Sequence, residues 1–159
     1  MGESHASADG IIHYGREGTL LFVVTAAPSW SDASWREMLD GSLAMETRMG
    51  SAALLVFSYC PEGLPTAVQR RMSVETTHKS RLADRVALLT DSAFVRGALT
   101  AIQWVLRKET NTKAYRPADV EAAIRWLALG HAIDVPAALR RADAMIRAAH
   151  VAAGRPLSR

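Results

Sequence analysis

The sequence predicts an α/β fold: a five-stranded mixed, mostly parallel sheet flanked by helices, with an extra helix at the C-terminal end. Three observations predict it. Short apolar runs bounded by glycine and proline alternate with segments of helical periodicity. The chain has 159 residues, which suits one domain, and its 49% hydrophobic and 22% charged residues are typical of a globular protein. Strands that alternate with helices are usually joined by right-handed crossovers, so most should pair in parallel.

The first two predicted strands form a hairpin. They cover residues 11–14 and 19–27 and are joined by a glycine-bounded turn at 15–18. The second strand reads TLLFVVTAA, and such a continuous apolar run is typical of a strand buried on both faces. Residues 1–9 are small and polar and have no period, so we predict that this N-terminal segment is disordered.

A helix and a third strand should follow the hairpin. Ser34 and Glu37 form a capping-box pattern, apolar residues then recur at helical spacing, and Gly50 is placed to end the helix. Residues 52–59, AALLVFSY, predict a second doubly buried strand. The next helix, about 64–79, should lie loosely on the surface because few of its positions are apolar: Leu64, Val68, Met72 and Val74.

The remaining strands and helices continue the alternation. Residues 85–90, RVALLT, predict a buried strand, and Asp91 and Ser92 are placed to cap a helix whose inner side carries Phe94 and Val95. A short strand at 112–115 and a helix starting near Asp119 complete the pattern.

The last predicted helix, 135–153, is capped by Asp134 and has a narrow apolar seam: Val135, Leu139, Ala142, Ile146 and Ala149. A seam must be covered, because an isolated helix of this length is marginal in water. The helix could fold back on its own sheet or pair with the same helix of a second copy. We expect a homodimer, since small alanines let two helices approach closely. Leu139 and Ile146 are therefore candidate partner-binding residues.

The order of elements resembles the STAS family, the anti-sigma-factor-antagonist-like domains, in its looser branch related to the CRAL-TRIO lipid-binding fold. Two stretches carry the resemblance: RVALLTDSAFVRGALTAIQWV from Arg85 and KAYRPADVEAAIRWL from Lys113. The resemblance implies a STAS-like domain over residues 10–129, with 130–159 as a C-terminal helical extension. These are packing motifs, so they indicate fold more than function.

The family's phosphorylation site has no match at the corresponding position. Typical members carry a serine after an aspartate where the helix following the third strand begins. Here that stretch is SYCPEG, from Ser58, and the Asp91–Ser92 pair follows the next strand. Asp91 and Ser92 could instead hold an anion with Arg96, one turn into the helix, although simple capping is the expected role. We keep Ser58, Asp91, Ser92 and Arg96 as a candidate anion or ligand loop.

No motif indicates catalysis, a metal site or a cofactor. The histidines and the single Cys60 do not have metal-ligand spacing, and no glycine-rich phosphate loop or nucleophile motif is present. Cys60 ends a buried strand without a pattern that would supply a base, so we expect a small buried thiol. The four tryptophans, Trp30, Trp35, Trp104 and Trp126, are expected to pack, with ligand stacking as the alternative for one of them. We predict no enzymatic activity and no cofactor.

Charge and hydropathy limit the partners. The formal net charge of +3 is small for the length, so we do not expect nucleic-acid binding. No apolar run is long enough to cross a membrane, the N-terminal segment does not resemble a signal peptide, and one cysteine suits a reducing compartment; we expect a cytoplasmic protein without membrane insertion. Arg70 and Arg71 lie on the sparsest helix and are the best candidates to meet an acidic partner.

Two functions remain open. The first is a non-catalytic regulatory or scaffolding domain that binds a protein or peptide, and we expect this one. The second is a carrier or sensor of a small apolar ligand or lipid. The first predicts a solid interior and an exposed apolar seam, whereas the second predicts an enclosed apolar pocket of several hundred Å³.

Overall fold

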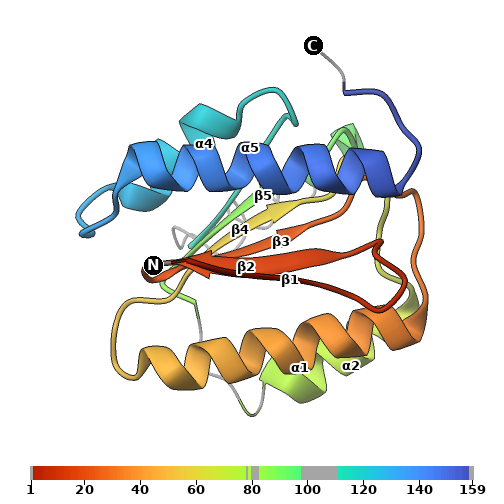
Figure 1. Cartoon of the computed structure of the whole chain (residues 1–159), viewed down its shortest axis with the longest axis horizontal. Coiled ribbons are helices and arrows are strands. Elements are labelled where there is room, and N and C mark those ends of the chain that lie inside the picture. Colours follow the sequence, from red (N-terminus) through yellow and green to blue (C-terminus); the bar gives the residue numbers. More distant parts are fainter. Residues whose placement is uncertain (1, 78, 80–82, 98–110, 158–159) are drawn as a thin grey trace.

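A single central sheet lies between two layers of helices (Figure 1). The computed structural model describes residues 2–77, 79, 83–97 and 111–157. The sheet has six strands in the order β1-β2-β3-β4-β5-β6. The strands are β1 (Glu3–Ala6), β2 (His13–Glu17), β3 (Leu20–Val24), β4 (Leu55–Tyr59), β5 (Arg85–Leu89) and β6 (Thr112–Tyr115).

The sheet is mixed and mostly parallel, as predicted. β1 pairs with β2 and β2 with β3 in antiparallel fashion, while β3, β4, β5 and β6 are parallel to one another. Phe22 of β3 lies opposite Phe57 of β4, and Phe57 lies opposite Ala87 of β5. All three side chains are fully buried. The three continuous apolar runs therefore form the centre of the sheet, where both faces are covered.

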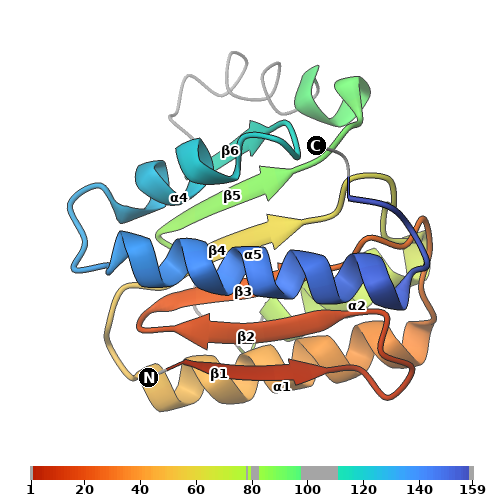
Figure 2. The same ribbon diagram turned by 45° about the horizontal axis from the view of Figure 1, so that its top comes forward.

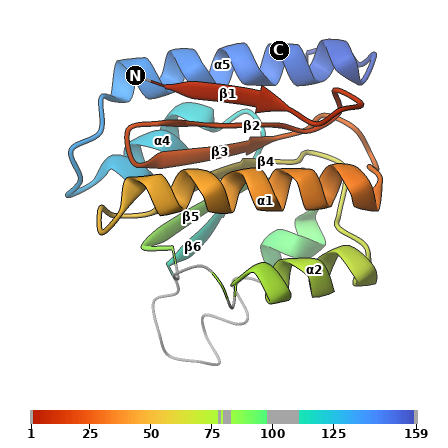
Figure 3. The same cartoon turned by 60° about the horizontal axis from the view of Figure 1, so that its bottom comes forward.

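Helices cover both faces. α1 (Asp32–Met49) and α2 (Ala67–Thr77) lie on one face, as Figure 3 shows. α4 (Val120–Ala128) and α5 (Val135–Ala152) lie on the other, with α4 over β4 and β5 and α5 over β2 and β3 (Figure 2). No helix among the described residues is long and apolar enough to cross a membrane.

The sequence predicted five strands, and the structure has six. The additional strand is β1, inside the segment 1–9 that was predicted to be disordered. β1 is an edge strand whose side chains stay largely exposed, so it shows no apolar period. Long-range ion pairs hold it instead: the Glu3 carboxylate accepts from Arg16 Nε at 2.7 Å and from Arg48 Nη2 at 2.7 Å. Gly15 of β2 permits the close pairing, because a Cβ there would collide with the Glu3 carbonyl oxygen.

α1 begins earlier than the predicted capping box. Its N-cap is Ser31, whose side-chain oxygen accepts from the Ser34 backbone N–H at 3.1 Å. The two residues of the predicted box fasten the loop after β1 instead. Ser34 Oγ donates to the Asp9 carboxylate at 2.6 Å, and the Glu37 carboxylate accepts from the Ala8 N–H at 2.9 Å. The predicted C-terminal stop is confirmed, since Gly50 caps α1 with a positive φ of 63°.

The C-terminal helix, which lies in the predicted extension over 130–159, packs in the main core. Ala142, Ile146 and Ala149 of the predicted seam are buried, and Leu139 packs partly buried against the same cluster. Ala138 and Met145 are buried beside them, so the apolar face is wider than the seam indicated. α5 therefore folds back on its own sheet. The seam that favoured a homodimer is covered within the chain.

The helix predicted to follow Asp91 and Ser92 can be followed only in part. Residues 93–97 are helical, and the remainder of the prediction, including Trp104, lies outside the described residues. Phe94 was predicted on the inner side but is 82% exposed.

Candidate functional site

Two cavities open at the edge of the sheet where the parallel strands β3, β4 and β5 end, one on each face. The carboxyl ends of parallel strands are the usual place for ligand sites in open α/β sheets, because the connecting loops meet there. We call them the apolar cavity, on the face of α1 and α2, and the polar cavity, on the face of α4 and α5. Tyr59, the last residue of β4, lines both.

The apolar cavity has a volume of about 430 Å³. Its floor is made by Val23, Ser58 and Leu88, which lie opposite one another in the register of β3, β4 and β5. Thr25 and Thr90 follow at the strand ends. The remaining lining comes from the loop before α1, from α1 itself and from the β4–α2 connection and α2: Trp30, Trp35, Cys60, Gly63, Leu64, Pro65 and Arg70.

Two stacked tryptophans form one wall of this cavity. The rings of Trp30 and Trp35 lie 5.5 Å apart with an angle of 21° between their planes. Trp35 Nε1 donates to the Gln69 carbonyl oxygen at 3.0 Å and to Ser73 Oγ at 3.1 Å. Trp30 Nε1 is buried and has no hydrogen-bond partner in the part of the chain that the structure describes. The wall therefore offers a flat apolar surface, and the Trp30 N–H beside it is a buried donor without a partner in the described residues.

Polar contacts, more than apolar ones, hold the helix that covers the cavity. The prediction of few buried apolar positions in this helix fits the structure, since Val68 and Val74 of α2, and Leu64 in the loop before it, are about half exposed. Gln69, however, is only 2% exposed. Its Nε2 donates to the Trp30 carbonyl oxygen at 3.1 Å and to Asp32 Oδ1 at 2.9 Å. Sequence reasoning missed Gln69, because a glutamine on a polar helix carries no signal of burial.

Cys60 lines the cavity but is poorly suited to nucleophilic chemistry. Its Sγ–H donates to the Gly63 carbonyl oxygen at 2.9 Å. Burial raises the pKa of the thiol to about 12, so it stays protonated at neutral pH, and the thiolate is the reactive form. Over the described ranges, no group of three His, Cys, Asp or Glu side chains is arranged to hold a metal ion.

The structure does not bring the four residues of the predicted anion loop together. Ser58 lies in the floor of the apolar cavity, and Asp91 lines the polar cavity. Ser92 Oγ accepts from the Val95 N–H at 3.2 Å, which is the capping role expected from the sequence. Arg96 Nη1 donates to the Thr90 carbonyl oxygen at 2.6 Å, so it ties its helix to the end of β5.

The predicted partner-binding residues also fall in different places. Arg70 lines the apolar cavity, and its Nη1 donates to the Pro65 carbonyl oxygen at 2.8 Å. Arg71 is exposed on α2. Leu139 and Ile146 pack in the core, as described above.

The polar cavity, of about 310 Å³, lies on the opposite face of the sheet. In its lining, the hydroxyl oxygen of Tyr59 is 3.0 Å from His150 Nε2, in a hydrogen bond between β4 and α5. Burial, and secondarily the charge of Asp91, raise the pKa of Tyr59. Arg155 Nη2 and the Glu62 carboxylate form an ion pair at 2.5 Å.

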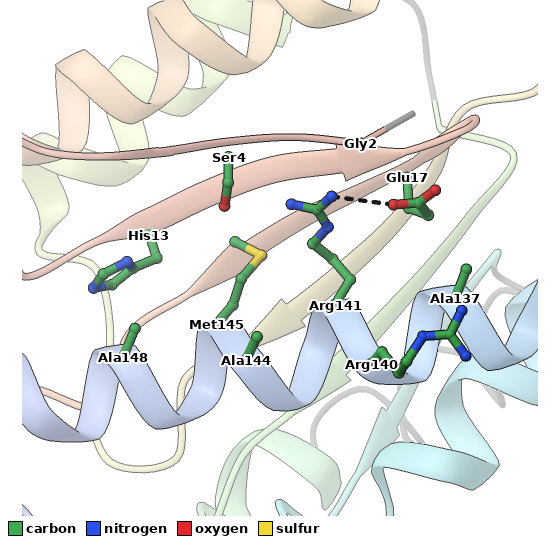
Figure 4. A pocket seen from close by; sticks show the side chains of 10 residues that line it. All are labelled: Gly2, Ser4, His13, Glu17, Ala137, Arg140, Arg141, Ala144, Met145 and Ala148. Carbon is green, nitrogen blue, oxygen red and sulfur yellow. Dashed lines mark hydrogen bonds and ion pairs between the residues drawn. The ribbon is translucent and has the colours of Figure 1, made fainter.

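A third hollow is a wide groove between the β1–β2 edge and α5 (Figure 4). Its volume is about 610 Å³. In Figure 4, Arg141 of α5 reaches across to Glu17 of β2, and Arg141 Nη2 donates to the carboxylate at 3.2 Å. This ion pair bridges the groove, and the groove is more open to solvent than the two cavities. It is the least suited of the three to enclose a small molecule.

No known family model, curated protein or solved structure matches this chain. The resemblance to the STAS family therefore stays a prediction from the sequence.

Proposed function

We propose that this protein is a non-catalytic carrier or sensor that binds a small, mainly apolar molecule in the apolar cavity. The observation that carries the proposal is a partly enclosed cavity of about 430 Å³ with a mainly apolar lining, at the carboxyl ends of three parallel strands. This volume lies within the range of ordinary small-molecule sites.

The cavity and the covered seam of the C-terminal helix weigh against the other expected function, a regulatory domain that binds a protein or peptide. That function was expected to need a solid interior and an exposed apolar seam on the C-terminal helix. The seam is covered by the chain's own sheet, and the interior next to α2 is hollow. A partner protein would have to use another surface, such as the one around Arg71.

The lining indicates the chemistry of the ligand. The stacked Trp30 and Trp35 rings suit a flat or chain-like apolar body. The buried N–H of Trp30 has no partner among the described residues, and an unmet buried donor is costly, so a ligand with one hydrogen-bond acceptor would satisfy it. The other polar side chains of the lining include the Arg70 guanidinium, which donates to the Pro65 carbonyl oxygen, and the hydroxyls of Thr25, Ser58 and Thr90.

The test is to fill the cavity from its floor. Ser58→Phe places a ring between the Val23 and Leu88 positions, and Ser51→Phe adds the same ring at an exposed turn as the matched control. The fluorescent compound 1-anilinonaphthalene-8-sulfonate, which joins an apolar aromatic body to one sulfonate, serves as the ligand. We expect the wild-type protein and the Ser51→Phe variant to bind it with equal affinity, and the Ser58→Phe variant to lose at least about tenfold in affinity.

Near-ultraviolet circular dichroism must show that all three proteins are folded, because molten globules also bind this compound. Should Ser58→Phe not fold, Trp30→Phe replaces it, since this change keeps an aromatic ring in the wall but removes the N–H together with the five-membered ring of the indole. Amide hydrogen exchange in α2 should slow when the ligand binds the wild-type protein. Equal binding by the wild-type and cavity-filled proteins, with no slowing in α2, would refute the proposal.

A further inference from the structure

The polar cavity contains two opposite charges that do not neutralise each other. Its lining holds two carboxylates and two guanidinium groups, from Glu62, Asp91, Arg116 and Arg155. Arg155 and Glu62 are paired with each other. The side chains of Arg116 and Asp91 take part in no hydrogen bond or ion pair within the described parts of the chain. One cation and one anion thus face the same small space without a partner.

A buried histidine in the same lining also has an unused polar atom. His150 is only 7% exposed, and its Nε2 is bonded to Tyr59. Its Nδ1 is buried and has no partner among the residues that the structure describes. If Tyr59 donates to Nε2, then Nδ1 is an unmet donor; if Nε2 carries the proton, then Nδ1 is an unmet acceptor. Either tautomer leaves a polar atom to be satisfied, and buried polar atoms in proteins rarely remain unpaired.

The rest of the lining is small and stiff. It consists of Ala26, Pro61, Pro117, Ala118 and Pro156. Proline and alanine have no side-chain rotamers to lose, so this wall can hold a ligand at little cost in conformational entropy. The volume of about 310 Å³ is at the small end of the range for ligand sites. The space suits a compact polar molecule.

We propose that the polar cavity binds a free α-amino acid beside His150, with its carboxylate at Arg116 and its ammonium group at Asp91. A simple anion that bound Arg116 would be repelled by the Asp91 carboxylate. A simple cation that bound Asp91 would be repelled by the Arg116 guanidinium. A zwitterion satisfies both charges at once, and guanidinium is the preferred cationic partner of a carboxylate. This site and the apolar cavity lie on opposite faces of the sheet, and neither proposal depends on the other.

The experiment begins with the full chain and each standard L-α-amino acid at millimolar concentration. We expect at least one of them to raise the melting temperature, because a ligand that binds only the folded state stabilises it. Isothermal titration calorimetry then measures the affinity for the amino acid with the largest effect. Its methyl ester and its N-acetyl derivative each lack one of the two charges. Each should bind about tenfold to a hundredfold more weakly, the usual effect of losing one charge-assisted hydrogen bond.

Two variants and two controls locate the site. Arg116→Gln and Asp91→Asn remove the unpaired charges and should each weaken binding by a similar factor. Arg147→Gln and Asp143→Asn remove the same charges from an exposed ion pair on α5 outside the cavity lining, and should leave the affinity unchanged. In protein labelled at the histidine ring nitrogens, the His150 signals should shift during the titration, while those of His131, outside the lining, should not.

Three results would overturn the proposal: no amino acid binds at millimolar concentration, the ester and the N-acetyl compound bind as well as the parent, or the two cavity variants behave like the controls. Tighter binding of the N-acetyl compound by Asp91→Asn would show an anion site in place of a zwitterion site. Loss of binding to the fluorescent compound in Ser58→Phe, with amino-acid binding retained, would confirm that the two sites are separate.

Discussion

Replacement of Ile146 by alanine tests whether α5 is part of the core. The Ile146 side chain is 7% exposed and packs in the cluster formed by the sheet, α4 and α5. The substitution removes three carbon groups, and at about 0.8 kcal/mol for each buried group the transfer term alone is about 2.4 kcal/mol. The void left behind adds to this, so we expect the free energy of unfolding to fall by about 3–4 kcal/mol.

Urea denaturation followed by circular dichroism measures this change. We expect one transition for the whole chain, with the slope unchanged and the midpoint lowered. Val151→Ala is the matched control, because Val151 lies on the same helix and is 82% exposed; its effect should stay within about 0.5 kcal/mol. A loss below about 1 kcal/mol for Ile146→Ala, or a separate early transition for α5, would contradict the packing described here.

Three further predictions concern single groups. Cys60 should react with iodoacetamide far more slowly in the native protein than in urea at pH 8, because a pKa of about 12 leaves a thiolate fraction of about 10⁻⁴; equal rates would contradict the raised pKa of this thiol. Hydrogen bonds from Arg48, and then from Arg16, lower the Glu3 pKa from 4.5 to about 2, so this carboxylate stabilises the fold above pH 4.5 and the gain is lost as the pH falls toward 2. Glu3→Gln should therefore lower the melting temperature at pH 7 and have little effect at pH 2, which a series of melting curves at low ionic strength checks. Ser92→Ala should lower the free energy of unfolding by about 1 kcal/mol, because the helix loses its cap, and urea titrations measure this change. No change in the free energy of unfolding would show that the cap does not stabilise the fold.

The central strands could be predicted from the sequence because they are buried on both faces. A continuous apolar run such as LLFVV in β3 is stable only as a strand in the middle of the sheet, so both the strand and its central position follow from composition alone. β1 could not be predicted in this way. Its stability depends on Arg16 and Arg48, which lie 13 and 45 residues along the chain from Glu3, and a local pattern does not contain such pairings.

Whether α5 packs on its own sheet or on a second copy could not be decided from the sequence, for a different reason. A seam with alanines at Ala142 and Ala149 can approach a sheet as closely as another helix, so the sequence fits both arrangements. The structure adds Ala138 and Met145 to the buried face, and this wider face matches a sheet. The α/β class was confirmed, while the number of strands was not.

The candidate sites were harder to predict than the fold. Arg70 was singled out as part of a basic surface, and Asp91 as a helix cap or part of an anion or ligand loop. Their places in two cavities depend on how the loops meet beyond β4 and β5. Trp30 and Trp35 were expected to pack, and their stacking could be anticipated only as one alternative. His150 gave no signal, because its partner Tyr59 is 91 residues away.

The late position of α5 in the chain has a consequence for synthesis on the ribosome. The strands that it covers, β2 and β3, are among the first to emerge, yet their α5-side surface is closed only when residues 135–152 follow. Leu20, Phe22 and Val24, all fully buried in the finished protein, belong to the cluster that α5 completes. A nascent chain that has passed β6 but not α5 therefore carries an uncovered apolar sheet face, a surface of the kind that aggregates or binds chaperones. Slow translation between β6 and α5 should therefore lower the yield of folded protein, because it prolongs the exposure of this face.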